Sequence, residues 1–264
     1  MIIVLETDFG ADGYYAAQMK GVILRIAPEA KIIDLTHQIE PQNIKQASFL
    51  LKNAYNYFPD NSIFICVVDP GVGSERRAIA LKAKNRYFIG PDNGIFNFLW
   101  IDNNNIEAIH LNRKEYFFND ISNTFHGRDI FAPVAAHLAS GVKFLDFGEP
   151  ISTSELIKLP EIISHIEEDG SLTGEIIFID GFGNLITSIS SERIESTFGN
   201  KEFKIIYRVE TISGFFQNYF DALNGKPFAY IGSSNHLEIA VKNGNAAQYL
   251  NGNTGDLIRI SELE

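Results

Sequence analysis

Strand-like and helix-like segments alternate through the first half of this chain, and that alternation restricts the fold more than any other feature. Short apolar runs predict buried strands at 2–5, 31–35 and 63–68. Between these runs, apolar residues recur at helical spacing over 13–26 and 43–58. This order is typical of an α/β domain in which helices flank a mainly parallel sheet.

Shorter segments follow in the same half. Residues 78–83 and 86–89 are apolar or alternating and can pair with each other, whereas 94–100 predicts a short helix. A longer helix is predicted over 128–140, although Pro133 disfavours its opening turns.

Past residue 150 the helical spacing almost disappears. Strand-like runs separated by Gly, Asn and Ser turns are predicted at 174–179, 184–190, 203–209, 228–232, 236–241 and 256–260. Such spacing indicates a smaller all-β, barrel-like domain. We therefore expect an α/β N-terminal domain over residues 1–160 and a β-barrel-like C-terminal domain over residues 161–264.

Charge and composition limit the partners. The formal charge of −11 opposes nucleic-acid binding, which needs clustered cations, and favours a cationic or zwitterionic small molecule. The single Cys66 lies in an apolar run and indicates a buried residue in a reducing compartment. There is no basic leader and no apolar stretch near the ~18 residues that a membrane span requires, so we expect a cytoplasmic protein without membrane association.

Three short segments place acids, a guanidinium and an imidazole at chain turns. They are Thr7-Asp8-Phe9-Gly10, the run from Val68 to Arg77, and Phe125-His126-Gly127-Arg128-Asp129. Each follows an apolar run or opens a helical pattern. Because ligands of open α/β sheets bind beyond the carboxyl ends of the strands, the three segments predict one active site.

The two acids each allow two interpretations. Asp8 suits a turn or a helix N-cap, or it can accept hydrogen bonds from a ribose diol. Asp69 opens an Asp-Pro-Gly-Val-Gly turn, or it is a functional carboxylate that a nearby guanidinium fixes. Arg76 and Arg77 compete for that contact, since neighbouring extended residues point to opposite sides.

His126 precedes the predicted helix. It is either a helix-end histidine without a catalytic part or a neutral ring that accepts a proton or orients a water, because a helix N-terminus disfavours the imidazolium. Phe125 can supply an apolar wall. Asp34 and His37 form a further candidate pair, for which a structural hydrogen bond is an equally good explanation.

Two turns of the C-terminal half can contribute polar groups. Asp180-Gly181-Phe182-Gly183-Asn184 is a hairpin turn or a polar rim, and Gly232-Ser233-Ser234-Asn235-His236 is a tight turn whose hydroxyls could hold a carboxylate.

A metal site is the alternative assembly. Oxygen and nitrogen donors for a hydrolytic metal centre occur at Asp8, Asp34, His37, Asp69, Asp92, Asn93 and His126. No His-x-x-x-His, paired aspartates or cysteine set supports it, so we expect no metal.

These segments, together with Pro-Asp-Asn-Gly at 91–94 and Gly-Ser-Ser-Asn-His-Leu-Glu-Ile-Ala at 232–240, resemble the S-adenosyl-L-methionine (SAM) hydrolases that form adenosine. This family, also called SAM hydroxide adenosyltransferases, is related to the bacterial fluorinase and chlorinase. The resemblance runs in order from residue 7 to about residue 247. It implies a homotrimer that binds SAM between the N-terminal domain of one subunit and the C-terminal domain of the next, with no cofactor.

The resemblance also implies residue roles. Asp69, Arg76 and His126 match the catalytic triad around the attacking water, and Asp8 matches the ribose-binding acid. The other matches lie in the C-terminal domain: Asn184 at the adenine, Asp180 and Ser233 at the methionine ammonium and carboxylate, and Glu238 with the backbone near Val241 on the same wall. The halogenating relatives have tyrosines in place of Asp69 and His126, which favours water as the nucleophile here.

The expected reaction is attack of water or hydroxide on the 5′ carbon of SAM, with Asp69 or His126 as the proton acceptor. Two alternatives stay open. One is a metal-dependent nucleotidase or phosphatase, and the other is a non-catalytic protein that binds SAM or adenosine.

Overall fold

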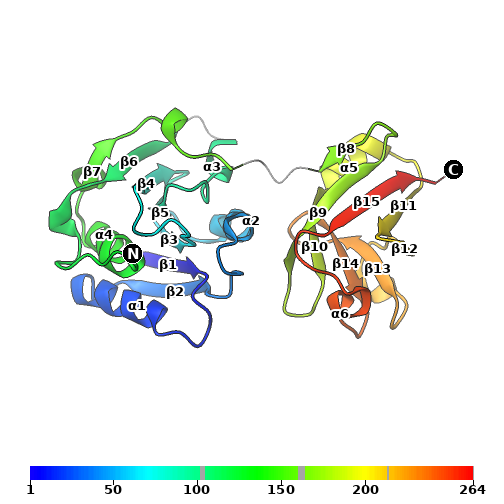
Figure 1. The fold of residues 1–264 in the computed structure, drawn as a ribbon, viewed down its shortest axis with the longest axis horizontal. Coiled ribbons are helices and arrows are strands. Elements are labelled where there is room, and N and C mark those ends of the chain that lie inside the picture. Colours follow the sequence, from blue (N-terminus) through cyan, green and yellow to red (C-terminus); the bar gives the residue numbers. More distant parts are fainter. Residues whose placement is uncertain (102–104, 160–163, 213, 264) are drawn as a thin grey trace. The chain divides into compact units, whose positions relative to one another are not determined.

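The structure is a computed structural model that describes residues 1–101, 105–159, 164–212 and 214–263. The chain divides into two compact units, Met1–Leu159 and Pro160–Glu264 (Figure 1). The predicted boundary between residues 160 and 161 lies outside the described residues. Among those residues, no helix is long and apolar enough to cross a membrane.

A seven-stranded sheet forms the centre of the N-terminal unit, in the order β2-β1-β3-β5-β4-β6-β7. The strands are β1 (Ile2–Thr7), β2 (Lys31–Thr36), β3 (Ile63–Val67), β4 (Ala78–Ala83), β5 (Arg86–Pro91), β6 (Glu107–Leu111) and β7 (Gly148–Pro150). Strands β2, β1, β3 and β5 are parallel, whereas β4, β6 and β7 continue the sheet with antiparallel pairs. The sheet is therefore mixed.

The expectation of a mainly parallel sheet is not confirmed, and a hairpin explains why. Lys84 and Asn85 join β4 to β5 with φ values of +48° and +58°. A two-residue turn with both φ values positive forces antiparallel pairing, because parallel neighbours need a long crossover. Pairing between these two strands agrees with the sequence, but β6 and β7 were not predicted and extend the antiparallel half.

Helices cover both faces of this sheet. They are α1 (Tyr15–Ile26), α2 (Ile44–Ala54), α3 (Phe98–Ile101) and α4 (Ala132–Ala139), with a π-helical turn at Gly127–Phe131 and 3-10 turns at Tyr55–Tyr57, Lys114–Tyr116, Phe144–Phe147 and Thr153–Glu155. One core cluster joins Met19 and Ala135 of α1 and α4 to Leu5 of the sheet. A second cluster joins Leu51 of α2 to Phe64 on the sheet. The sheet is therefore packed against helices on both faces, which holds the ends of its strands in place.

An antiparallel, barrel-like sheet forms the C-terminal unit (Figure 1). Its strands are β8 (His165–Ile166), β9 (Leu172–Ile179), β10 (Leu185–Ser190), β11 (Phe203–Tyr207), β12 (Glu210–Ile212), β13 (Pro227–Ile231), β14 (His236–Val241) and β15 (Leu257–Glu262). Their order is β12-β11-β15-β9-β10-β14-β13, with β8 on β9. This architecture agrees with the predicted all-β domain.

Two short helices and one 3-10 turn, Tyr219–Asp221, were not predicted in this unit. Helix α5 (Ser191–Phe198) begins where the Ser190 side chain accepts a hydrogen bond from a backbone N–H, and α6 (Ala246–Leu250) begins in the same way at Asn245. Both helices are too short for their apolar spacing to be distinctive.

Candidate active site

The two predicted acids lie at the same edge of the sheet. Asp8 follows β1 and Asp69 follows β3, and these strands are parallel neighbours. Their carboxyl ends therefore meet at one edge, where open α/β sheets bind ligands.

A cavity of about 260 Å³ opens at this edge. It is lined by Asp8, Phe9, Gln42, Val67, Asp69, Pro70, Val72, Thr124, Phe125, His126 and Gly127. Four predicted residues, Asp8, Asp69, Phe125 and His126, thus share one hollow. Gln42 and Thr124 were missed because no local pattern separates them from other polar residues of loops, and Val72 was not singled out within the run from Val68 to Arg77.

Asp69 and Arg76 form a buried ion pair. Arg76 Nε donates to the two carboxylate oxygens at 2.9 and 3.0 Å, and a terminal nitrogen also donates to Oδ2. Both side chains are less than one-tenth exposed. Two guanidinium nitrogens on one carboxylate fix the plane of the carboxylate and stabilise its negative charge.

Glycines make this pairing possible. The Arg76 side chain folds back over Gly71, where a Cβ would lie 3.3 Å from Arg76 Cγ. Gly73 has a φ of +77°, and a Cβ there would lie 2.3 Å from the Asn123 carbonyl oxygen. The loop after β3 thus needs glycine for both its conformation and its close packing.

Arg77 turns to the other side, as adjacent residues of an extended segment do. Its Nε donates to Asp92 Oδ2 at 2.9 Å. The competition between the two arginines is resolved in the structure, because Arg76 contacts Asp69 whereas Arg77 contacts Asp92.

His126 completes the cluster through the same arginine. A terminal nitrogen of Arg76 lies 2.8 Å from His126 Nδ1. Since a guanidinium only donates, Nδ1 is the acceptor and the neutral ring carries its proton on Nε2. Burial and the Arg76 charge lower the pKa of His126, against smaller opposite effects of Asp69 and Asp129.

A buried aspartate fixes the segment before His126. Asp129 is fully buried, and its carboxylate accepts hydrogen bonds from the Ser122 N–H at 2.8 Å and from Arg128 Nε at 2.6 Å. It lies in the π-helical turn that begins at Gly127. Such turns are frequent at functional sites, and His126 directly precedes this one.

Asp8 is oriented by a neighbouring loop. Its Oδ2 accepts the Gln42 N–H at 2.9 Å, while Gly10 N–H donates to the His37 carbonyl at 2.7 Å. Phe9 packs edge-on against Phe125 with ring centroids 5.5 Å apart. One side of the cavity is therefore apolar, and the Asp8 carboxylate is held by a backbone donor.

The other candidate pair, Asp34 and His37, has a separate set of contacts. His37 Nδ1 lies 2.9 Å from the buried Thr7 hydroxyl, and Asp34 pairs with Lys20 at 2.5 Å and with His37 at 3.1 Å. This network ties β2 and α1 to the end of β1 and does not line the cavity.

In the C-terminal unit, Asp180 and Asn184 form one turn. Asp180 Oδ1 accepts the N–H groups of Phe182 and Asn184, each at 2.9 Å, and Oδ2 accepts the Asn184 side-chain amide at 2.9 Å. The hairpin interpretation is thus correct for the backbone. The Phe182 ring, four-fifths exposed, projects from the same turn.

Glu238 lies near that turn and belongs to a second acid cluster. The Tyr230 hydroxyl donates to Glu238 Oε2 at 2.5 Å from the opposite position on the neighbouring strand. Burial and the Asp180 charge raise the pKa of Glu238, although the Tyr230 hydrogen bond acts against them. Tyr230 was missed by sequence reasoning, and its cross-strand register with Glu238 is the signal that could have found it.

The remaining predicted residues of this unit differ in exposure. Ser233 is exposed next to Gly232, where a Cβ would lie 1.8 Å from Glu238 Oε1. The turn thus packs directly on the Glu238 carboxyl group. Val241 is buried, and its carbonyl accepts the Tyr219 hydroxyl at 3.1 Å.

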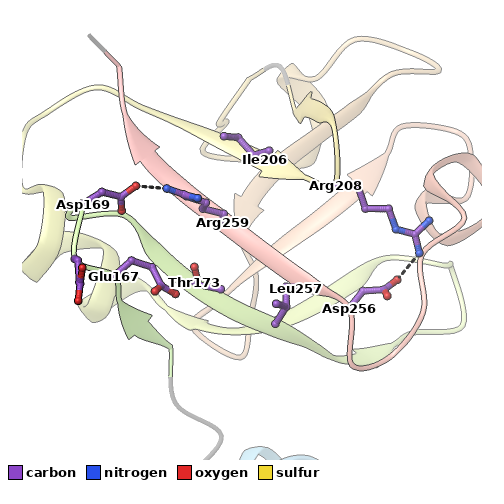
Figure 2. Close-up of a pocket in the computed structure, with 9 residues that line it drawn as sticks. Glu167, Asp169, Thr173, Ile206, Arg208, Asp256, Leu257 and Arg259 are labelled. Atoms are coloured by element: carbon purple, nitrogen blue, oxygen red, sulfur yellow. Dashed lines mark hydrogen bonds and ion pairs between the residues drawn. The ribbon is translucent and has the colours of Figure 1, made fainter.

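A larger hollow of about 890 Å³ lies on the outer face of β9, β11 and β15 (Figure 2). Its described lining is Glu167, Glu168, Asp169, Thr173, Ile206, Arg208, Asp256, Leu257 and Arg259, without a predicted site residue. Arg259 pairs with Asp169 and Arg208 with Asp256, so both guanidinium groups are already neutralised.

The donors considered for a metal centre are spread over separate ion pairs. Asp34 contacts Lys20, Asp69 contacts Arg76, and Asp92 contacts Arg77. Among the described residues, no group of three or more His, Cys, Asp or Glu is arranged to hold a metal ion.

Comparison with known proteins covers both units. Residues 3–148 match the model of the SAM hydroxide adenosyltransferase N-terminal domain, and residues 174–259 match that of its C-terminal domain. The chain is 36% identical over 263 residues to the (R)-S-adenosyl-L-methionine hydrolase of Salinispora tropica, which covers 98% of this chain and 97% of that protein. It is 25% identical over 268 residues to the fluorinase of an Actinoplanes species, with 90% of each chain covered. It also resembles the crystal structure of an uncharacterized conserved protein from Thermotoga maritima, with a TM-score of 0.87 and 36% identity over 98% of this chain and 99% of that one.

Proposed function

The chain belongs to the SAM hydroxide adenosyltransferase family, and on this premise we propose that it hydrolyses SAM to adenosine and L-methionine. The observation that carries the proposal is the Asp69–Arg76–His126 cluster at the cavity. One arginine holds a carboxylate and an imidazole at the same hollow, next to the ribose-binding candidate Asp8.

The contacts of Arg76 divide the roles of the other two residues. His126 Nδ1 accepts from Arg76, so its Nε2–H is a donor that can hold the water or hydroxide oxygen. Asp69 oxygens keep lone pairs beyond their bonds to Arg76, so Asp69 takes the water proton. Arg76 is the group that aligns both.

The chemistry asks little else of the protein. The water oxygen forms a bond to C5′ while the C5′–S bond breaks, and the bonding electrons leave with sulfur. Methionine departs as a neutral thioether, so no general acid and no cofactor is required. Because hydroxide and sulfonium charges cancel as they approach, the apolar wall of Phe9 and Phe125 does not oppose the transition state.

Substrate binding uses both units in this proposal. Asp8 accepts the ribose hydroxyls, with its carboxylate held by the Gln42 N–H. In the C-terminal unit, Asn184 contacts adenine, Asp180 and Ser233 hold the methionine head group, and Glu238 and the backbone near Val241 form the adjoining wall. We further propose a homotrimer with each site shared between subunits, as the family resemblance implies. The cytoplasmic location stays a prediction.

Incubation with SAM, followed by chromatography, tests the proposal. We expect adenosine and L-methionine in equal amounts, unchanged by chelator and without 5′-halogenated nucleosides when chloride or fluoride is added. Turnover that chelator abolishes would favour a metal-dependent nucleotidase. SAM binding without any product would favour a binding protein. Light scattering during size-exclusion chromatography tests the trimer.

A further inference from the structure

We propose that the turn at residues 91–94, Pro-Asp-Asn-Gly, is the positioning element of the loop that carries Asp69 and Arg76. This turn contacts the residue before Asp69 and the residue after Arg76, so it holds both ends of that loop. The proposal rests on the proposed function, because it assigns Asp92 and Asn93 as positioning residues for the same site.

Asn93 holds the start of the loop. Its side-chain amide donates to the Val68 carbonyl at 2.8 Å, and Val68 directly precedes Asp69. Asn93 Oδ1 in turn accepts the Ile95 N–H at 3.2 Å, which fixes the orientation of the amide. The Asn93 side chain therefore ties the backbone just before Asp69 to the turn, and both its amide nitrogen and its Oδ1 are hydrogen-bonded.

Asp92 holds the end of the loop through Arg77. The backbone N–H of Asp92 donates to the Arg77 carbonyl at 2.9 Å, which extends the ladder of β4 and β5 by one residue. Asp92 Oδ2 accepts Arg77 Nε at 2.9 Å and lies 2.7 Å from a terminal guanidinium nitrogen. Asp92 is only 2% exposed, so this contact is shielded from water on the acid side.

The same turn holds the last residues of the N-terminal unit. Asp92 Oδ1 accepts the Ile157 N–H at 2.9 Å, and Arg77 donates to the Glu155 carbonyl. Gly94 has a φ of +90°, and a Cβ there would lie 2.5 Å from Leu159 Cγ. Loosening the turn would thus release the catalytic loop and residues 155–159 together.

The two simultaneous contacts of Arg76 explain why the position of the loop matters. Arg76 must donate to Asp69 and to His126 at once, at 2.9 and 2.8 Å. A shift of the loop by a fraction of this distance breaks one of the two contacts. Asp8 lies at the end of another strand and is held by Gln42, so ribose binding would survive such a shift.

Arg77→Met and Asn93→Ala test the proposal, with Lys82→Met as the matched control. Lys82 lies in β4, close in sequence to Arg77, and it also forms an ion pair, but its contact with Glu107 at 3.1 Å is exposed. For both test variants we expect kcat to fall on the order of tenfold to a hundredfold, with KM for SAM nearly unchanged. The control should match the wild type in both constants.

A second readout does not depend on turnover. NMR titration of His126 should show its pKa moving up toward the ordinary histidine value in both test variants, because Arg76 would no longer be held against Nδ1. Of the other charged groups that face His126, Asp129 lies outside the loop and Asp69 moves with it, but the effect of Asp69 on the pKa of His126 is smaller than that of Arg76. Because lost burial would also raise the pKa of His126, the shift reports the displacement of Arg76 only where KM for SAM stays nearly unchanged, which a generally loosened site would not allow.

Folded Arg77→Met and Asn93→Ala proteins with wild-type kcat and a wild-type His126 titration would overturn the proposal. Arg77→Lys serves if Arg77→Met does not fold, since it keeps the charge but loses the two-nitrogen contact. If the wild-type protein does not convert SAM, the proposed function fails, whereas the His126 titration still decides the role of the turn.

Discussion

Arg76 donates a hydrogen bond to His126 Nδ1 at 2.8 Å, so the neutral imidazole carries its proton on Nε2. The sequence leaves Asp69 and His126 as equal candidates for the proton acceptor. This single contact separates them, because an imidazole that accepted a proton would place two positive groups side by side. We therefore propose Asp69 as the proton acceptor and His126 as the donor that holds the nucleophile.

Asp69→Asn should nearly abolish turnover while SAM still binds. Asparagine keeps the shape of the side chain but cannot take a proton, so kcat should fall by about 10²- to 10⁴-fold. Calorimetric titration with SAM and single-turnover kinetics measure the two effects separately. Asp34→Asn is the control, since Asp34 contacts Lys20 away from the cavity. Wild-type turnover in Asp69→Asn would refute the assignment of this acceptor.

His126 should titrate below the ordinary histidine pKa of about 6.5. Burial and the Arg76 charge lower the pKa of His126, so the ring stays neutral at pH 7 and becomes charged only in more acidic solution. We expect kcat to fall as the pH drops through this lowered value. NMR titration checks the assignment, and a His126 pKa at or above 6.5 would contradict it.

Loss of the Arg76 guanidinium should destabilise the fold. Removing one partner of a buried ion pair leaves the Asp69 charge uncompensated, at a cost of about 3–5 kcal/mol. Urea unfolding of Arg76→Met measures this change in the free energy of unfolding. The exposed Lys82–Glu107 pair is the comparison, because Lys82→Met should cost about 0–1 kcal/mol. Equal costs for the two variants would show that the Asp69–Arg76 pair is solvated.

Glu6 should make stability fall as the pH rises. It is fully buried beside Cys66 on the neighbouring strand, and burial raises the pKa of Glu6 to about 8 from 4.5. Between these values the folded chain keeps a proton that the unfolded chain releases, so the free energy of unfolding decreases by up to about 1.4 kcal/mol per pH unit. Glu6→Gln should remove this slope when urea unfolding is measured between about pH 5 and about pH 8. An unchanged slope would show that another group causes it.

Tyr230→Phe should weaken substrate binding without slowing the chemical step. Phenylalanine removes the hydrogen bond to Glu238, and the pKa of that acid should rise further because the bond favours its ionised form. We expect KM to rise about tenfold at constant kcat, the value of one hydrogen bond to a charged group. Tyr249→Phe is the control at an exposed position. A drop in kcat alone would place Tyr230 in the chemical step.

The strand-end acids could be read from the sequence because Asp8 and Asp69 lie shortly after the apolar runs at residues 2–5 and 63–68. Parallel neighbours then bring both residues to one edge. The order of strands was harder to predict, since the direction of β4 depends on two positive φ values at Lys84 and Asn85. Short apolar runs do not reveal the direction in which they pair.

The contacts of a side chain were harder to predict from the sequence than the place of its residue in the fold. Whether Arg76 or Arg77 meets Asp69 depends on the path of a glycine-rich loop, and no local pattern encodes that path. The contact between Tyr230 and Glu238 depends on cross-strand register. Asp129 looks like a helix-start residue in sequence, yet it is buried and accepts the Ser122 N–H.

We propose that water attacks C5′ of SAM at the Asp69–Arg76–His126 cluster. Turnover in ¹⁸O-labelled water, followed by mass spectrometry of both products, tests it most directly. We expect one ¹⁸O atom in the 5′-hydroxyl of adenosine and none in methionine. Unlabelled adenosine, or label found in methionine instead, would contradict it.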